Sequence, residues 1–319
     1  MSRVDVIIPV YNTPFRFLSV ALDSLRAQSF TDWTAWIIND ASEGSYTQEL
    51  VKRLEDYNDS RFQYLYSDHK GPAGSRNVGI SHGKAPYIAF LDSDDLWMPL
   101  ILERHISHLE KNNALALVHA HYELIDTEGA RLRSVPPHRD LNALGVSELF
   151  AALLRENFVS TSSVVVRRRV VEEVGGFDDT FPCLVDKDLW LRILNRGARF
   201  YYDPEVLFQY RLHPQNISKR TDLLLATRLR IIAKAEELIR GNPAFADIRW
   251  KRLKNDMLHH MHAEAAEGYL ERGETLLALK HSTRNLAGLS RNSFLLFTRT
   301  VYGAIRRLCT RINSRNKAD

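Results

Sequence analysis

The stretch YIAFLDSDD, residues 87–95, is a short apolar run followed directly by three acids within four positions. The apolar run has the length and composition of a buried β-strand. In an open parallel sheet, ligands bind beyond the carboxyl ends of the strands. The stretch therefore predicts an α/β fold in which polar residues beginning at Asp92 line a binding site.

Strand-like and helical runs alternate on both sides of this stretch. Strands are predicted over residues 4–10, 35–38, 62–66, 115–121, 162–166, 198–202 and 206–210, and helices over 15–27, 46–57, 75–82 and 186–195. Strands that alternate with helices of this size form βαβ units, so we expect a mainly parallel sheet with helices on both faces. After residue 222 only helical patterns follow, over 223–239, 250–270 and 276–286. We therefore expect a domain over 1–218 and a helical extension over 219–319.

The composition of the 319 residues is that of a globular protein, with 45% hydrophobic and 26% charged residues. The net charge of +4 is unevenly distributed, because the tail from Arg284 carries +7 and the remainder −3. The main body therefore gives no support to nucleic-acid binding. Two cysteines, Cys183 and Cys309, cannot form a disulfide framework, which indicates a reducing compartment. With no signal peptide and no apolar run of about 20 residues, we expect a cytoplasmic protein, soluble or peripheral on the inner membrane face.

The acids of residues 92–95 allow two interpretations. Three carboxylates within four positions repel one another unless a cation or hydrogen-bond donors neutralise them. Hard oxygen ligands of this kind suit Mg²⁺ or Mn²⁺, which bridge carboxylates to substrate phosphates. The alternative is a solvated acidic turn before the helix expected near Met98. Tyr11 and Asp40 follow two other predicted strands and should face the same crevice, although Asp40 could equally be a helix N-cap.

Seven motifs in this order resemble family 2 glycosyltransferases of the GT-A fold. The motifs are VIIPVYN (6–12), NDAS (39–42), SRNVG (75–79), FLDSDD (90–95), GGFDD (175–179), DKDLWLR (186–192) and YRLHPQNIS (210–218). The resemblance covers residues 3–218 and implies a GT-A nucleotide-diphosphate-sugar-binding domain. It also implies an inverting, Mn²⁺- or Mg²⁺-dependent transfer of a sugar, most often from a UDP donor, to a glycan or lipid-linked acceptor hydroxyl in polysaccharide biosynthesis of the cell envelope.

The resemblance also implies roles for individual residues. Asp186 matches the catalytic base, Asp94 the metal-bridging acid with Asp95 as second choice, and His213 a further metal ligand. The nucleotide-binding positions are Pro9, Tyr11, Asp40, Arg76, Asp92 and Arg211. Each role has a structural alternative: Arg76 could pair with a surface acid, Asp186 could cap the helix that follows it, and His213 could be a loop histidine.

Three positions depart from the family pattern. Asn39 stands where an acid is usual, Val185 stands where a glutamate often precedes the base, and His69 replaces a common asparagine. These departures keep open a non-catalytic protein that binds a nucleotide sugar or acts as a scaffold. A sugar-1-phosphate nucleotidyltransferase is a further alternative, but it would carry a glycine-rich loop where this chain has YNTP (11–14).

The C-terminal tail mixes apolar residues with arginines, as in FLLF (294–297) followed by Arg299, Arg306 and Arg307. As a helix, this segment could lie on an anionic membrane surface. A helix packed on its own domain or on a second subunit of a homo-oligomer would have nearly the same pattern.

Overall fold

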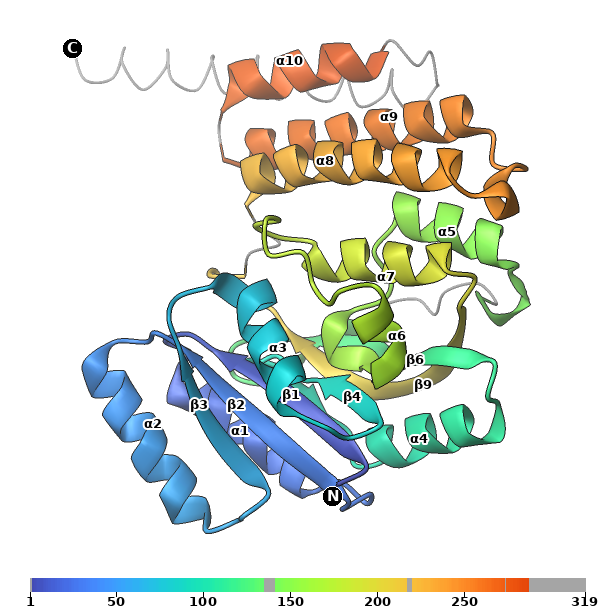
Figure 1. The fold of residues 1–319 in the computed structure, drawn as a ribbon. Helices are drawn as coiled ribbons and strands as arrows, with labels where there is room; N and C mark the ends of the chain where they lie inside the picture. Colours follow the sequence, from blue (N-terminus) through green and yellow to red (C-terminus); the bar gives the residue numbers. More distant parts are fainter. Residues whose placement is uncertain (1, 135–140, 217–219, 273, 287–319) are drawn as a thin grey trace, which may run out of the picture. The chain divides into compact units, whose positions relative to one another are not determined.

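The computed structural model describes residues 2–134, 141–216, 220–272 and 274–286 (Figure 1). The chain divides into two compact units, Met1–Asn216 and Ile217–Asp319, and we describe each by itself. The predicted basic tail falls mostly within residues 287–319, which lie outside the described residues.

A single mixed sheet of nine strands organises the first unit, with the order β3-β2-β1-β4-β8-β6-β9-β5 and with β7 paired to β6. The expected parallel arrangement holds for β3, β2, β1 and β4 and for the β6–β9 pair. The other pairs, β4–β8, β6–β8, β5–β9 and β6–β7, are short and antiparallel, so the sheet is mixed. The strands are β1 (Val4–Val10), β2 (Trp33–Asp40), β3 (Phe62–Ser67), β4 (Tyr87–Phe90), β5 (Leu96–Trp97), β6 (Leu115–Ile125), β7 (Arg131–Ser134), β8 (Val164–Arg167) and β9 (Arg199–Arg211).

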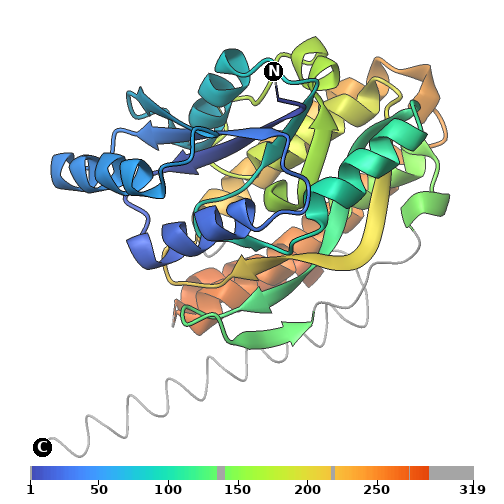
Figure 2. The same ribbon diagram turned by 90° about the horizontal axis from the view of Figure 1, so that it is seen from below.

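Helices cover both faces of this sheet (Figures 1 and 2). Alternate residues of β1 explain the layers, because successive side chains of a strand point to opposite faces. Val4, Val6 and Ile8 belong to the core shared with α1 and α4, whereas Ile7 faces α3. The helices of this unit are α1 (Phe15–Arg26), α2 (Gly44–Tyr57), α3 (Gly71–His82), α4 (Ile101–Lys111), α5 (Val146–Arg155), α6 (Arg168–Glu173) and α7 (Val185–Asn195).

Helix α3 approaches the sheet closely at Gly79. A Cβ at this position would lie 2.8 Å from the Cγ2 of Ile7 and 2.9 Å from the Cδ1 of Ile38. These contacts are too short for any side chain, so glycine is what allows α3 to pack against β1 and β2. This packing fixes the position of α3, whose residue Arg76 pairs with Asp92 after β4.

Two predicted strands, 198–202 and 206–210, form one long strand in the structure, β9. The break in the sequence pattern coincides with an irregular register beside β6, between Ala120 and His121, where β9 passes through Asp203 and Pro204. A bulge accommodates the proline without ending the strand. The elements β5, β7, α5 and α6 were not predicted because they are short or lie in the weakly patterned region after residue 125.

The described part of the second unit contains the helices α8 (Thr221–Arg240), α9 (Trp250–Glu271) and α10 (Thr275–Leu286). Ala265, Tyr269 and Ala278 form a small buried cluster between α9 and α10, with Leu225 of α8 packed against it. No helix in the described ranges is long and apolar enough to cross a lipid bilayer.

Helix α4 buries a histidine whose ring has no hydrogen-bond partner among the described residues. His105 is fully buried, and both ring nitrogens lack a partner. Burial lowers its pKa from 6.5 to about 3, with Asp203 acting in the opposite direction. The ring is therefore neutral in the folded protein, but it binds a proton in the unfolded chain below about pH 6.5.

We expect His105→Leu to reduce the acid sensitivity of the fold. Between the folded and unfolded pKa values the unfolded chain binds more protons, so stability falls as the pH is lowered through this range. At pH 5 the loss attributable to His105 is about 2 kcal/mol, from about 1.4 kcal/mol per pH unit. Denaturant unfolding at pH 7 and pH 5 should show a smaller pH effect in this variant than in the wild type or in the exposed control His82→Gln. Equal pH effects in all three proteins would contradict the assignment.

Candidate active site

The loops that follow β1 and β2 are cross-linked at the carboxyl edge of the sheet. The backbone N–H of Asn12 donates to the Oγ of Ser42 (3.0 Å), and the N–H of Glu43 donates to the Oδ1 of Asn12 (3.0 Å). Asn12 and Ala41 both have left-handed backbones, with φ of 48° and 56°. Strained non-glycine residues of this kind cluster at functional sites. The Oγ1 of Thr13 lies 2.7 Å from the Oγ of Ser93, which joins these loops to the acidic turn.

Asp40 organises the start of α3. Its two carboxylate oxygens accept hydrogen bonds from the N–H groups of Lys70 (2.8 Å) and Gly71 (2.9 Å). The Nδ1 of His69 lies 3.1 Å from the same carboxylate, and the His69 ring is 4.6 Å from the ring of Tyr11. Tyr11 is 54% exposed and Asp40 only 3%. Tyr11 and His69 therefore present the accessible surface here, and Asp40 supports it from below.

Asn39, which replaces the usual acid, is fully buried, and both polar atoms of its side chain form hydrogen bonds. Its Nδ2 donates to the Oγ1 of Thr47 (2.8 Å) and to the hydroxyl of Tyr64 (3.0 Å), and its Oδ1 accepts from the N–H of Ser42 (3.0 Å). The amide supplies both donors and an acceptor, so it holds the loop after β2 without adding a negative charge.

The acidic turn after β4 is held from within by Asp95. One of its oxygens accepts from the hydroxyl of Ser162 (2.7 Å), and the other accepts from the backbone N–H of Arg211 (3.0 Å). The Ser162 oxygen also accepts from the N–H of Asp92 (3.1 Å). Burial, with the charges of Asp94 and Asp92, raises the pKa of Asp95 well above its usual range. Because both oxygens of Asp95 already have donors, the geometry favours Asp94 over Asp95 as a metal ligand.

Asp94 and His213 meet at the surface of this turn. The Nε2 of His213 is 2.7 Å from the Oδ2 of Asp94, and the Nδ1 is 3.0 Å from the Oε1 of Gln215. Arg211 is buried beside them, with its Nε donating to the backbone oxygen of Asp94 (2.9 Å) and its Nη1 to that of Asp126 (3.0 Å). The Arg211 side chain therefore fixes the turn, and its predicted role in nucleotide binding remains a prediction.

Asp92 faces two further charged groups. It forms an ion pair with Arg76, whose guanidinium is 5% exposed and also lies 5.5 Å from the ring of Phe177. Burial raises the pKa of Asp92, the negative charges of Asp94 and Asp186 raise it further, and Arg76 lowers it. Asp186 therefore lies close enough to act electrostatically on the acidic turn, although it is about ninety residues away in the sequence.

Asp186 is the second residue of α7, next to a strained connection at Leu184 (φ 53°). Its Oδ1 accepts from the N–H of Lys187 (2.8 Å), and its Oδ2 accepts from the Nδ2 of Asn157 (3.1 Å). Asp188, two residues further on, is buried and paired with Arg192 at 2.8 Å. The two acids of this helix therefore have different environments.

The residues at the acidic turn fit a divalent cation. Asp94 and His213 bring an oxygen and a nitrogen ligand to one point, beside the negative charge of Asp92. The described residues contain no group of three or more His, Cys, Asp or Glu side chains that could hold a metal ion. A Mg²⁺-type ion can nevertheless be bound through a single carboxylate such as that of Asp94, because it takes most of its other ligands from substrate phosphates and water.

The sequence profile of Glycosyl transferase family 2 matches residues 5–175. The chain belongs to this family. The matched residues include the loops after β1 and β2, the start of α3 and the acidic turn, whereas Asp186, Arg211 and His213 lie beyond them.

Curated glycosyltransferases match about two thirds of the chain. An uncharacterized glycosyltransferase of Rickettsia bellii is 32% identical over 218 residues, which are 68% of this chain and 31% of the relative. The UDP-Glc:alpha-D-GlcNAc-diphosphoundecaprenol beta-1,3-glucosyltransferase WfgD of Escherichia coli is 28% identical over 194 residues, which are 60% of this chain and 69% of that protein. The chain thus spans about a third of the length of the Rickettsia relative.

Solved structures of similar fold are GT-A-type glycosyltransferases. TarS residues 1–349 of S. aureus in complex with UDP-GlcNAc has a TM-score of 0.63 at 13% identity and covers 99% of this chain and 92% of its own. The mannosyltransferase PcManGT of Pyrobaculum calidifontis in complex with GDP-Man and Mn²⁺ has a TM-score of 0.61 at 16% identity, covering 96% and 87%. These likenesses establish the GT-A fold of this family 2 chain.

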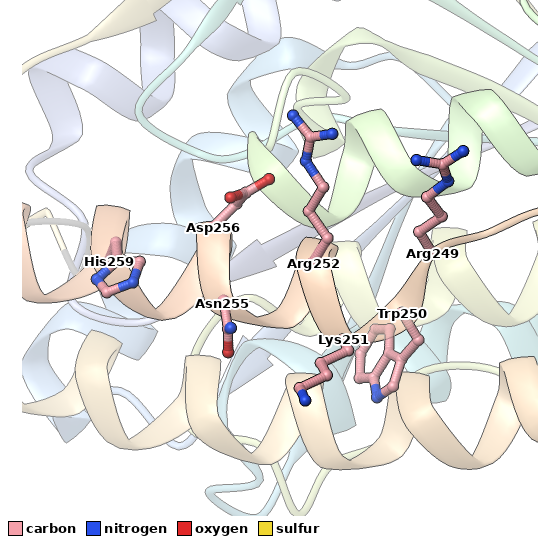
Figure 3. A pocket seen from close by; sticks show the side chains of 7 residues that line it. All are labelled: Arg249, Trp250, Lys251, Arg252, Asn255, Asp256 and His259. Atoms are coloured by element: carbon pink, nitrogen blue, oxygen red, sulfur yellow. The ribbon is translucent and has the colours of Figure 1, made fainter. Parts of the chain in front are cut away.

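The second unit has a pocket of about 680 Å³ at the start of α9 (Figure 3). Its lining is mainly basic and aromatic and contains one carboxylate, that of Asp256. The lining residues are Arg249, Trp250, Lys251, Arg252, Asn255, Asp256 and His259. This pocket has a single acid, whereas the acidic turn of the first unit has three, Asp92, Asp94 and Asp95. We therefore place the candidate site for sugar transfer in the first unit.

Sequence reasoning missed two polar residues of the family 2 site, Ser162 and Asn157. Ser162 lies just before β8 in the chain, and its hydrogen-bond partners Asp92 and Asp95 lie about 70 residues earlier. Asn157 lies in the connection between α5 and β8 and reaches an acid 29 residues later. Neither residue carries a local sequence signal, because only the antiparallel course of β8 and the packing of α5 on α7 bring them to the site.

Proposed function

We propose that the first unit catalyses metal-dependent, inverting transfer of a sugar from a nucleotide diphosphate donor, with UDP as the expected nucleotide, to an acceptor hydroxyl. The observation that carries this proposal is the convergence of Asp92, Asp94 and Asp186 with His213 at the carboxyl edge of the sheet. Family membership and the nucleotide sugars bound by TarS and PcManGT support it.

In the proposed reaction Asp186 acts as the base. It takes the proton from the acceptor hydroxyl while the acceptor oxygen forms a bond to the anomeric carbon. The bond between that carbon and the diphosphate oxygen breaks on the opposite side, and the electron pair leaves with the nucleotide diphosphate. When bound, a divalent cation would stabilise the negative charge on the diphosphate. Asp94 and His213 are the residues that would hold this cation, and Asp92 would contact the ribose.

The nucleotide would lie over the loops that follow β1 and β2. Tyr11 offers an exposed ring for stacking a base, next to the ring of His69. Asp40 holds this surface through its bonds to residues 69–71. Pro9 lies at the end of β1 beside Ile38, and the pair of Arg76 with Asp92 links the base and diphosphate parts of the site.

The acceptor is proposed to be a glycan or a lipid-linked glycan of a cell-envelope polysaccharide. Support comes from WfgD, whose name specifies a diphosphoundecaprenol-linked acceptor. An anionic membrane surface would bring the cytoplasmic enzyme to such an acceptor. Contact of the C-terminal tail with that surface, or with a second subunit, stays a prediction.

Donor hydrolysis tests this function without knowledge of the acceptor. Purified protein is incubated with UDP-Glc, UDP-GlcNAc and GDP-Man, with Mn²⁺, with Mg²⁺ or with a chelator, and the released nucleotide diphosphate is measured. We expect slow release from one donor, most strongly with UDP sugars, and loss of release with the chelator. Binding of a nucleotide sugar in calorimetry without any release would favour the non-catalytic alternative. If the protein neither bound a nucleotide sugar nor released a nucleotide diphosphate, the proposal would be overturned.

A further inference from the structure

Asn157 is an amide in direct contact with the proposed base. Its Nδ2 lies 3.1 Å from the Oδ2 of Asp186, while the Oδ1 of Asp186 is held by the N–H of Lys187 at 2.8 Å. The reverse orientation of the amide would place its carbonyl oxygen against a carboxylate, which is unfavourable. Each oxygen of Asp186 therefore has one donor, and the direction of the carboxylate is set from two sides.

The backbone around Asn157 is fastened to α7. The Nζ of Lys187 donates to the carbonyl oxygen of Leu154 (2.8 Å), and the Nε1 of Trp190 donates to that of Val159 (3.1 Å). Both α7 side chains are buried, Lys187 at 5% exposure and Trp190 at 0%. The segment that carries Asn157 is thus held on both sides by the helix that carries Asp186, which limits how far the amide can move relative to the carboxylate.

The side-chain oxygen Oδ1 of Asn157 is buried and accepts no hydrogen bond from the part of the chain that the structure describes. A buried acceptor without a donor costs free energy, so a native protein keeps one where a water molecule or a substrate hydroxyl completes it.

We propose that Asn157 is the positioning residue of Asp186: its amide aims the carboxylate and stabilises the ionised form that accepts the proton. This inference rests on the proposed function, in which Asp186 is the base. It also explains how the site works with Val185 in place of an acid, because an uncharged amide, rather than a second carboxylate, supports the base. Asp92, which is paired with Arg76, acts electrostatically on Asp186, whereas the ammonium of the neighbouring Lys187 donates to the carbonyl oxygen of Leu154.

The test compares Asn157→Ala and Asn157→Asp with Gln63→Ala, which removes an exposed amide that donates to the carbonyl oxygen of Ser60. We expect Asn157→Ala to lower kcat 10- to 100-fold while the KM for the donor stays within twofold, because a misplaced base costs rate rather than donor binding. The acid limb of the kcat profile should move to higher pH, since the ionised carboxylate has lost a donor. Asn157→Asp should move it further, because two adjacent carboxylates disfavour ionisation. Gln63→Ala should match the wild type.

A measurement on the folded protein separates this inference from the proposed function. NMR titration of ¹³C-labelled aspartate carboxyls, with Asp186→Asn used for assignment, gives the titration midpoint of Asp186 without turnover. A higher midpoint in Asn157→Ala supports the positioning role even if no donor is turned over, in which case only the function fails. An unchanged midpoint with an unchanged pH profile overturns the role of Asn157. A general loss of activity with unaltered midpoint and lower thermal stability overturns it too, because that result describes a structural residue.

Discussion

Asp186→Asn is expected to lower kcat for sugar transfer by about a hundredfold to ten-thousandfold. The amide has nearly the shape of the carboxylate and can still accept from the N–H of Lys187. It cannot take a proton from the acceptor hydroxyl, and general base catalysis contributes about 10²- to 10⁴-fold to rates of this kind. Nucleotide release in the presence of acceptor measures the loss, and calorimetry with the donor should show binding close to that of the wild type.

The matched control for this substitution is Asp179→Asn. Asp179 is an exposed acid in the GGFDD motif, a few residues before α7, and it has no part in the site described above. The control should retain wild-type turnover and unfold at the same temperature as Asp186→Asn. Full activity of Asp186→Asn would remove this residue from the mechanism, and the inference about Asn157 would fall with it.

Asp94→Ala should lower kcat by two to three orders of magnitude and abolish the response of the enzyme to Mn²⁺. The substitution removes the carboxylate that meets His213, and it leaves the three hydrogen bonds of Asp95 and Ser162 in place. A cation on a departing diphosphate is worth several kcal/mol of charge stabilisation, which corresponds to a loss of this size. Titration of Mn²⁺ in the presence of UDP should show weaker metal binding than in the wild type.

An exposed acid distant from the turn, Asp32, provides the control for metal binding. Asp32→Ala should bind Mn²⁺ and UDP as the wild type does. If Asp94→Ala kept its Mn²⁺ response while His213→Ala lost it, the cation would be held without Asp94. That outcome would contradict the pairing of ligands inferred from the 2.7 Å contact.

The sequence predicted the first half of the fold because its signals there are local. The strands β1, β2 and β4 are mainly apolar runs, and polar residues follow them at the edge where the site lies. The antiparallel strand β8 could not be placed in this way, since its neighbours β4 and β6 are distant in the chain. The sequence pattern therefore did not predict that β8 makes the sheet mixed.

The same distinction applies to the acids of the site. The FLDSDD motif predicted that Asp92, Asp94 and Asp95 lie together, but it could not predict which hydrogen-bond partners each of them has. The separation comes from Ser162 and Arg211, which engage Asp95 and leave Asp94 beside His213. Likewise, the sequence showed Asn39 only as a missing charge, whereas its three buried hydrogen bonds show that an amide suits that position.

The attachment of Asp95 to two remote segments has a consequence during synthesis of the chain. Its partners follow it by 67 and 116 residues, so they leave the ribosome long after the acidic turn itself. A nascent chain that ends before Arg211 carries the strands β1 to β4 but lacks the bond that finishes the turn. The acidic turn can therefore reach its folded arrangement only after almost the entire first unit has emerged.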